Sequence, residues 1–83
     1  HLNDDFYGSE IHPDDHDQLR VNAIDMLKGA RNNPYEYRII DRQGKIKRLM
    51  ETVRSITYEG KRAILGNTMD ITKRYQMTAP YYF

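Results

Sequence analysis

The sequence predicts an α+β fold, in which one long helix is followed by a three-stranded antiparallel meander. Three observations predict it: apolar residues at helical spacing within residues 14–28, alternation of apolar and polar residues from residue 35, and two glycine-centred turns after that. The chain has 83 residues, which is the size of one small domain. Hydrophobic residues make up 39% of the sequence and charged residues 30%, as is typical of a globular domain.

The helix is expected to run from about residue 14 to about residue 28. Pro13 suits the first helical position, because its φ is fixed and its missing N–H has no partner to lose. His12 stands at or next to the cap, and the acidic residues that follow favour the positive end of the helix dipole. Gly29 marks the end of the helix. The apolar stripe consists of Leu19, Ala23, Met26, Leu27 and Ala30.

Three strands are expected to follow, over residues 35–42, 46–58 and 62–72. Gly44 and Gly60 supply the positive φ that the two hairpin connections need. The segment before the helix, residues 1–10, reads as a loop or a short helical turn. The chain therefore divides into a domain, residues 1–75, and a linker or tail, residues 76–83.

Several function classes lack any support in the sequence. There is no cysteine, which excludes disulfides and thiolate sites and agrees with a reducing, cytoplasmic location. No apolar run approaches the roughly 20 residues that span a bilayer, and no signal-peptide pattern opens the chain. The chain has neither a glycine-rich phosphate loop nor a nucleophile-elbow motif, so we expect no enzymatic activity.

The three histidines are candidate ligands for a metal or a haem. His12 and His16 are four residues apart, which places them on one face of a helix. The glutamate that a zinc-protease helix requires is missing and no third ligand is evident, so we expect no metal site. The neighbouring acidic residues also lack the spacing of a calcium loop. His16 shares the stripe of Leu19 and Ala23, and an inward His16 would be the candidate haem ligand.

Nucleic-acid binding is the alternative function. The net charge is only +1, but residues 1–42 hold nine acidic and five basic residues, whereas residues 43–83 hold three acidic and eight basic. Sheets that bind nucleic acids usually add exposed aromatic side chains, and Tyr58 is the only aromatic residue in that half before the C-terminal linker. A solvated hairpin explains the basic residues more simply. The basic residues around the two hairpins are Lys45, Lys47, Arg48, Arg54, Lys61 and Arg62.

Five short motifs follow one another along the chain: residues 11–15 (IHPDD), 37–39 (YRI), 41–44 (DRQG), 64–66 (ILG) and 70–74 (DITKR). In this order and spacing they resemble the C-terminal two-thirds of a PAS sensor domain of the PAS fold-3 type, common in bacterial histidine kinases and cyclic-dinucleotide enzymes. The resemblance implies a five-stranded antiparallel sheet with helices over one face and a ligand cavity between them. The first two strands of that fold are absent from this sequence, and Arg48 stands where the family usually has an aromatic residue.

The resemblance implies a non-catalytic sensory and dimerisation module of a bacterial signal-transduction protein, such as a two-component histidine kinase. The signal would leave through Asp70, Ile71 and Thr72 into a helix that begins near Lys73 and leads to an output domain. The ligand stays open between haem, flavin, a small carboxylate and none, although a flavin held by a cysteine adduct is excluded. The candidate cavity residues are His16, Leu19, Ala23, Leu27, Tyr37, Ile39, Gly66 and Thr68.

The missing strands also predict a partner. In the family the last strand lies between the first and the fourth, so without the first strand residues 62–72 become an edge. This edge has no charge between residues 63 and 69, which makes it a template for pairing with another chain. We expect a homodimer through this strand, and the two alternatives are shielding by the aromatic tail and a poorly stable fragment. No contact with nucleic acid or membrane is expected from this segment.

Overall fold

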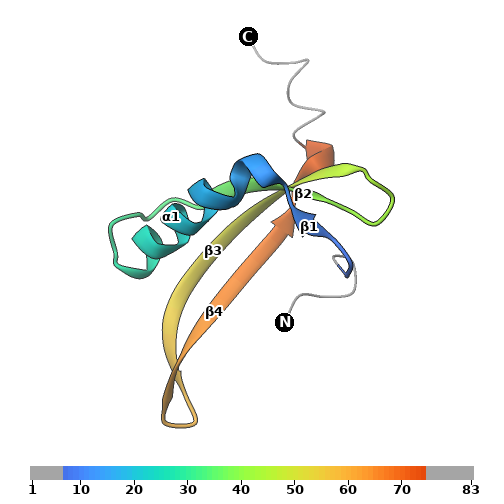
Figure 1. The fold of residues 1–83 in the computed structure, drawn as a ribbon. Coiled ribbons are helices and arrows are strands. Elements are labelled where there is room, and N and C mark those ends of the chain that lie inside the picture. Colours follow the sequence, from blue (N-terminus) through green and yellow to red (C-terminus); the bar gives the residue numbers. More distant parts are fainter. Residues whose placement is uncertain (1–6, 75–83) are drawn as a thin grey trace.

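The structure, a computed structural model, describes residues 7–74 as a helix on one face of an antiparallel sheet (Figure 1). A 3₁₀ turn, η2 (Pro13–Asp15), leads into helix α1 (His16–Leu27). The strands lie in the order β1-β2-β3-β4. Their bounds are β1 (Glu10–Ile11), β2 (Tyr35–Ile40), β3 (Ile46–Tyr58) and β4 (Lys61–Asp70). The predicted helix and three-stranded meander are confirmed, while the expected tail, residues 76–83, lies outside the described residues.

Strand β1 is an element that the sequence did not predict. Residues 7–9 form a turn and irregular backbone, as expected, but Glu10 pairs with Ile40 and Ile11 pairs with Ile39. A strand of two residues is too short to show an alternating pattern, and it forms only because β2 offers an edge to pair with. The sheet therefore has four strands in the described part of the chain.

Local signals explain both ends of the helix. The Nδ1 atom of His12 accepts a hydrogen bond from the N–H of Asp14 at 3.1 Å, so His12 is the cap of the first turn. At the other end Gly29 has a φ of +82° and donates its N–H to the carbonyl of Met26 at 3.1 Å. The N–H of Ala30 reaches the carbonyl of Asp25 at 2.8 Å, which completes a Schellman motif.

The two hairpin turns are glycine-centred, as the sequence predicts. In the first turn Gly44 has a φ of +83°, and the Asp41 carboxylate accepts the N–H groups of Gln43 and Lys45 at 2.9 and 2.8 Å. The pKa of the Asp41 carboxyl is lowered, and the main cause is the hydrogen bond from the backbone N–H of Lys45. The second loop has two residues, Glu59 and Gly60, both with positive φ, and this is the geometry of the tight turn that matches strand twist.

The core lies between α1 and the β2–β3 pair. Tyr35, Tyr37 and Ile39 alternate along β2 with more exposed residues, and Leu49 of β3 is 1% exposed. These four buried side chains form one cluster. The partly buried residues that pack against the cluster are Ile11, Leu19, Ala23, Met26 and Val53. Three residues of the predicted helical stripe, Leu19, Ala23 and Met26, therefore face the sheet, whereas Ala30 is exposed and lies beyond the end of α1.

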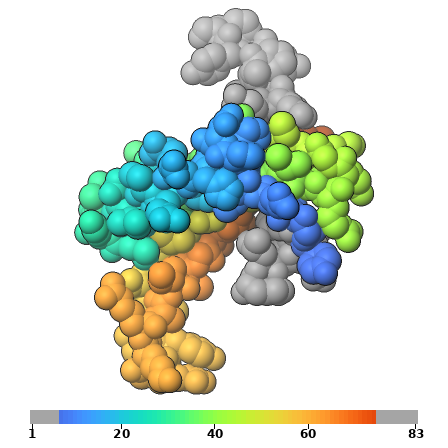
Figure 2. All heavy atoms as spheres, viewed as in Figure 1, coloured from blue at the N-terminus to red at the C-terminus, as the bar shows by residue number. Residues whose placement is uncertain are grey.

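The outer part of the β3–β4 hairpin extends beyond the helix as an arm (Figure 2). The last pair between β2 and β3 joins Tyr35 to Glu51, and beyond it β3 pairs only with β4. The N–H of Val53, on the side that β2 no longer covers, donates to the sulfur of Met26 at 3.2 Å. Further out Tyr58 and Ile64 are 63% and 62% exposed, so the arm has little core of its own.

Candidate functional site

The end of β4 is the first part of the candidate site. The strand ends at Asp70, and a helical turn covers residues 72–74. The Asp70 carboxylate accepts the N–H of Thr72 at 2.9 Å, while the side chain between them, Ile71, is buried. A carboxylate at this place satisfies an N–H group that the first turn of a helix leaves without a partner inside the helix. The described residues end with this helical turn, at residue 74.

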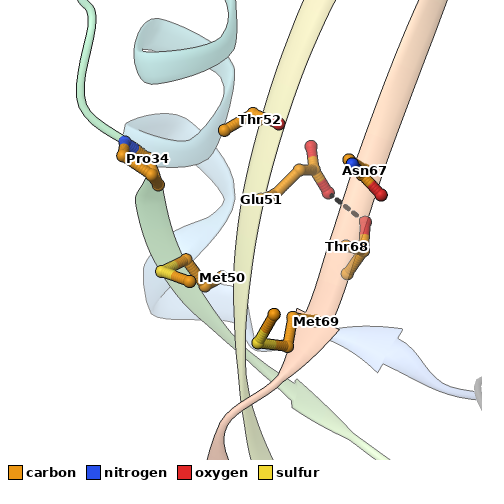
Figure 3. A pocket seen from close by; sticks show the side chains of 7 residues that line it. All are labelled: Pro34, Met50, Glu51, Thr52, Asn67, Thr68 and Met69. Atoms are coloured by element: carbon orange, nitrogen blue, oxygen red, sulfur yellow. Dashed lines mark hydrogen bonds between the residues drawn. The ribbon is translucent and has the colours of Figure 1, made fainter.

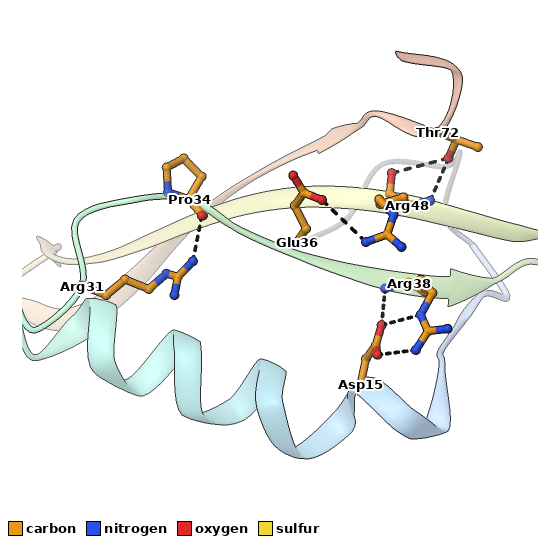
Figure 4. Close-up of polar contacts among 7 residues, drawn as sticks. All are labelled: Asp15, Arg31, Pro34, Glu36, Arg38, Arg48 and Thr72. Atoms are coloured by element: carbon orange, nitrogen blue, oxygen red, sulfur yellow. Dashed lines mark hydrogen bonds and ion pairs between the residues drawn. The ribbon is translucent and has the colours of Figure 1, made fainter. Parts of the chain in front are cut away.

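The same junction is tied to the neighbouring strand (Figure 4). The N–H of Arg48 donates to the hydroxyl of Thr72 at 2.8 Å, and the carbonyl of Arg48 accepts the N–H of Ile71 at 2.9 Å. Both backbone groups of Arg48 lie on the side of β3 that faces β4, at the point where β4 has ended. Thr72 and Ile71 therefore replace the next pair of the β3–β4 ladder and fix the start of the helical turn at residues 72–74 to β3.

A second junction joins the start of α1 to β2. The Arg38 guanidinium donates to both carboxylate oxygens of Asp15, at 2.7 and 3.0 Å, and the N–H of Arg38 donates to the same carboxylate at 2.7 Å (Figure 4). These side-chain hydrogen bonds, more than the Coulomb attraction, lower the pKa of Asp15 to about 2. The N–H of His12 donates to the carbonyl of Arg38 at 2.9 Å. Both backbone groups of Arg38 are thus held by the segment that begins the helix.

These two junctions lie on opposite sides of one pair of residues. Arg38 and Arg48 are direct partners across β2 and β3. The backbone N–H and C=O groups of Arg38 face the helix start, whereas those of Arg48 face the Ile71–Thr72 segment. The Arg48 side chain also reaches back to β2, where it lies 3.6 Å from the Glu36 carboxylate. A continuous path of hydrogen bonds and strand pairing therefore runs from Asp15 through both arginines to Thr72.

One carboxylate and three hydroxyl groups form a polar cluster on the face of the sheet that α1 covers. Glu51 accepts three hydroxyl hydrogen bonds, from Tyr37 at 2.6 Å, Tyr35 at 2.8 Å and Thr68 at 3.1 Å. The pKa of Tyr35 and of Tyr37 is raised well above the usual range. Burial is the main cause, and the hydrogen bond to Glu51 is the second. The cluster ties β2, β3 and β4 together at the level where β2 begins.

A pocket of about 210 Å³ opens beside this level of the sheet (Figure 3). Strand alternation places Met50, Thr52, Asn67 and Met69 on the face away from α1, and Pro34 closes one end. Glu51 and Thr68 complete the lining. With two methionines and two small polar side chains, the pocket offers an adaptable apolar surface and few fixed hydrogen-bonding groups.

The predicted cavity residues do not all come together. Leu19, Ala23, Tyr37 and Ile39 meet in the filled core between helix and sheet. Of the other four, Leu27 is partly buried, His16 and Gly66 are exposed, and Thr68 lines the pocket. Within residues 7–74 no three histidine or acidic side chains gather closely enough to hold a metal ion. The same residues form no helix long and apolar enough to cross a membrane.

Sequence reasoning gave no role to the Asp15–Arg38 pair or to the Glu51 cluster. In the sequence Asp15 is one of several acidic residues at a helix start, and no pattern singles out Glu51. Their partners are 23 and 14–17 residues away in the chain, so no local pattern connects them. Only the register of β2, β3 and β4 brings these groups into contact.

Comparisons with known proteins bear on the fold. A scan of protein-family models finds no match to the chain, and neither does a search of curated proteins. Among solved structures the chain is similar to a sensory box histidine kinase/response regulator from Burkholderia thailandensis E264, with a TM-score of 0.66 and 23% sequence identity. The match covers 87% of this chain but only 56% of that structure. The chain thus has an α+β, PAS-like fold and spans little more than half the length of the matched protein.

Proposed function

We propose that this PAS-like domain is a non-catalytic sensory module of a bacterial signal-transduction protein. Changes in the packing of the sheet, whether or not a ligand causes them, pass to an output helix that begins at Thr72. The likeness in fold to a sensory box histidine kinase supports the class of protein. The observation that carries the mechanism is the pair of hydrogen bonds between the backbone of Arg48 and the Ile71–Thr72 segment.

The physical argument starts from the position of β3. This strand lies between β2 and β4, so any shift of the sheet moves it. Arg48 on β3 holds Thr72 directly, and its partner Arg38 is held by Asp15 at the helix start. In this mechanism a displacement of α1 against the sheet reaches the output helix through the hydrogen bonds of Asp15 to Arg38, the strand pairing of Arg38 with Arg48, and the hydrogen bond of Arg48 to Thr72. Asp70 fixes the angle of that helix by accepting the N–H of Thr72.

The test distinguishes the role of the Thr72 hydroxyl group from the role of the side-chain volume. In the full-length signalling protein, Thr72→Val keeps the volume of the side chain and removes the bond to Arg48, whereas Thr72→Ser keeps the hydroxyl. We expect Thr72→Val, and Asp70→Ala, to leave the domain folded by circular dichroism and to make the output activity independent of stimulus. Thr72→Ser should keep regulation. Normal regulation in a folded Thr72→Val, Asp70→Ala double variant would refute this mechanism.

A further inference from the structure

The pocket beside the start of β2 lies on the face of the sheet that points away from α1 (Figure 3). The cavity predicted from the sequence lies on the opposite face, between helix and sheet, where the core cluster packs. The pocket is therefore a separate feature. Its two main walls come from β3 and β4, and both strands are described along the whole length of the pocket.

Two pairs of opposed side chains give the pocket one apolar and one polar half. Met50 of β3 is the direct partner of Met69 of β4. Two residues further along, Thr52 is the direct partner of Asn67, and alternation brings both pairs to the same face. None of these four side chains is charged. The lining thus matches a molecule with an apolar body over the methionines and one polar group beside Thr52 and Asn67.

The floor of the pocket is fixed from the other face of the sheet. Glu51 and Thr68 lie between the two lining pairs along the strands, so alternation turns their side chains away from the pocket. On the far face the Glu51 carboxylate accepts the Thr68 hydroxyl at 3.1 Å, and the hydroxyls of Tyr35 and Tyr37 at 2.8 and 2.6 Å. These hydrogen bonds hold β3 and β4 together beneath the pocket and keep the charge of Glu51 outside it.

The end wall at Pro34 is fixed to the segment that follows α1 (Figure 4). The Arg31 guanidinium donates to the carbonyl of Pro34 at 3.0 Å and to the carbonyl of Asn33 at 2.8 Å. The same guanidinium lies over the ring of Tyr35, 5.7 Å from its centroid. Floor and end wall are therefore held in place, whereas the flexible methionine side chains can adapt to an occupant.

We propose that this pocket binds a small uncharged phenol or alcohol. A hydroxyl group both donates and accepts hydrogen bonds, as do the side chains of Thr52 and Asn67. The volume of about 210 Å³ lies below the roughly 300–1,000 Å³ of pockets for drug-sized ligands, so the occupant is smaller than these. Its role as an input rests on the proposed function: Met69 directly precedes Asp70, whose carboxylate accepts the N–H of Thr72.

Binding can be measured at the methionine methyl groups, with 4-methylphenol as the probe and the full chain labelled with carbon-13 at these groups. We expect the signals of Met50 and Met69 to shift in a saturable manner. The signal of Met26, which belongs to α1 on the other face, should stay in place. Benzoate and benzylammonium have a similar size but carry a charge that no lining side chain in the pocket would balance, so they should bind at least about tenfold more weakly.

A matched pair of variants tests the polar half of the pocket. Thr52→Val keeps the side-chain volume and removes the hydroxyl, so it should weaken the binding of 4-methylphenol about fivefold, the effect of one hydrogen bond. Toluene, which has no hydroxyl group, should bind the parent chain and this variant equally. Thr57→Val, further along β3 and outside the pocket, is the control and should change neither affinity. An unchanged Met26 signal shows that each variant is folded.

Four results would overturn the proposal. The first is the absence of saturable shifts at Met50 and Met69, and the second is equal binding of the charged probes. The third is a nuclear Overhauser contact, without any probe, between these methyl groups and another segment of the chain. The fourth is a shift of the same signals with protein concentration alone, which would assign the pocket to a second copy. Loss of regulation through Thr72 would leave these signals unaffected, so the binding site and the proposed function can fail separately.

Discussion

Asp15 and Glu51 show how much of this fold depends on single carboxylates with several donors. Asp15 joins helix to sheet through three hydrogen bonds from Arg38, and Glu51 joins three strands through hydroxyl groups. Neither carboxylate could be assigned from the sequence, since each depends on partners brought together by strand register. Asp70 and Thr72 differ in this respect, because the short motif around them places a capping carboxylate and a hydroxyl at a strand end.

The pKa of Asp15 predicts a pH-dependent loss of stability. Its folded value, about 2, is lower than the ordinary value of 3.8, so the stabilisation is fully present above pH 3.8 and is lost as the pH falls towards 2. Asp15→Asn should therefore cost about 1 kcal/mol at neutral pH, near the upper end for a partly exposed ion pair. In a domain of this size that is a decrease in Tm of roughly 4–8 °C.

The measurement is the difference in Tm between the parent chain and Asp15→Asn at pH 7, 4, 3 and 2. The difference should shrink between pH 4 and pH 2, because the parent chain then loses the same bonds. Asp17→Asn, at an exposed position in the first turn of the same helix, is the control and should change the Tm little. A difference that stays constant down to pH 2 would show that Asp15 does not act as a carboxylate.

At the scale of the elements, local signals succeed where the chain dictates its own conformation. The helix end at Gly29 and the turns at Gly44 and Gly60 follow from positive φ, which the sequence marks with glycine. Strand β1 could not be predicted from local signals, because its two residues form a strand only by pairing with β2. The two faces of β2 were also predictable from the alternation along that strand.

The two glycines of the β3–β4 hairpin should respond differently to alanine. Gly60 has a φ of +77°, a conformation that costs a residue with a Cβ roughly 1–2 kcal/mol. Gly66 is not in this region and has room for a Cβ. Gly60→Ala should thus lower the free energy of unfolding by about 1 kcal/mol, and Gly66→Ala should leave it unchanged or raise it slightly. Urea denaturation compares them, and an equal loss in both variants would contradict the assignment.

On the scale of the whole molecule, the prediction of the fold went further than the prediction of the site. Helical spacing, alternation and turns were enough for the α+β class, and the likeness to a solved structure confirms it as PAS-like. The cavity residues were harder to predict. Alternation shows which residues share a face of the sheet, but not whether a helix or a pocket lies on that face. Helix α1 packs against the core cluster that contains Tyr37 and Ile39, while the pocket opens on the other face.

Hydrogen exchange should divide the molecule into two parts. The amides of β2 and of β3 up to Glu51 lie under the helix or between paired strands, so we expect their exchange to be the slowest. Beyond Glu51 the arm is a two-stranded ribbon, and such ribbons are marginally stable in water. Amides that pair β3 with β4 near Tyr58 should therefore exchange faster than those near Leu49, by nuclear magnetic resonance. Uniform protection along β3 would contradict this division.

The arm also makes the domain a convenient place to attach other molecules. Its tip, Glu59–Gly60, is far along the hairpin from the core cluster and from the junction at Thr72, and both neighbouring strands are exposed there. A peptide tag or a small fluorescent domain inserted between these two residues would interrupt no contact of α1. The inserted domain would be attached to the tip of the β3–β4 hairpin, so its fluorescence would report movements of the sheet. The helical turn at residues 72–74 would stay unmodified.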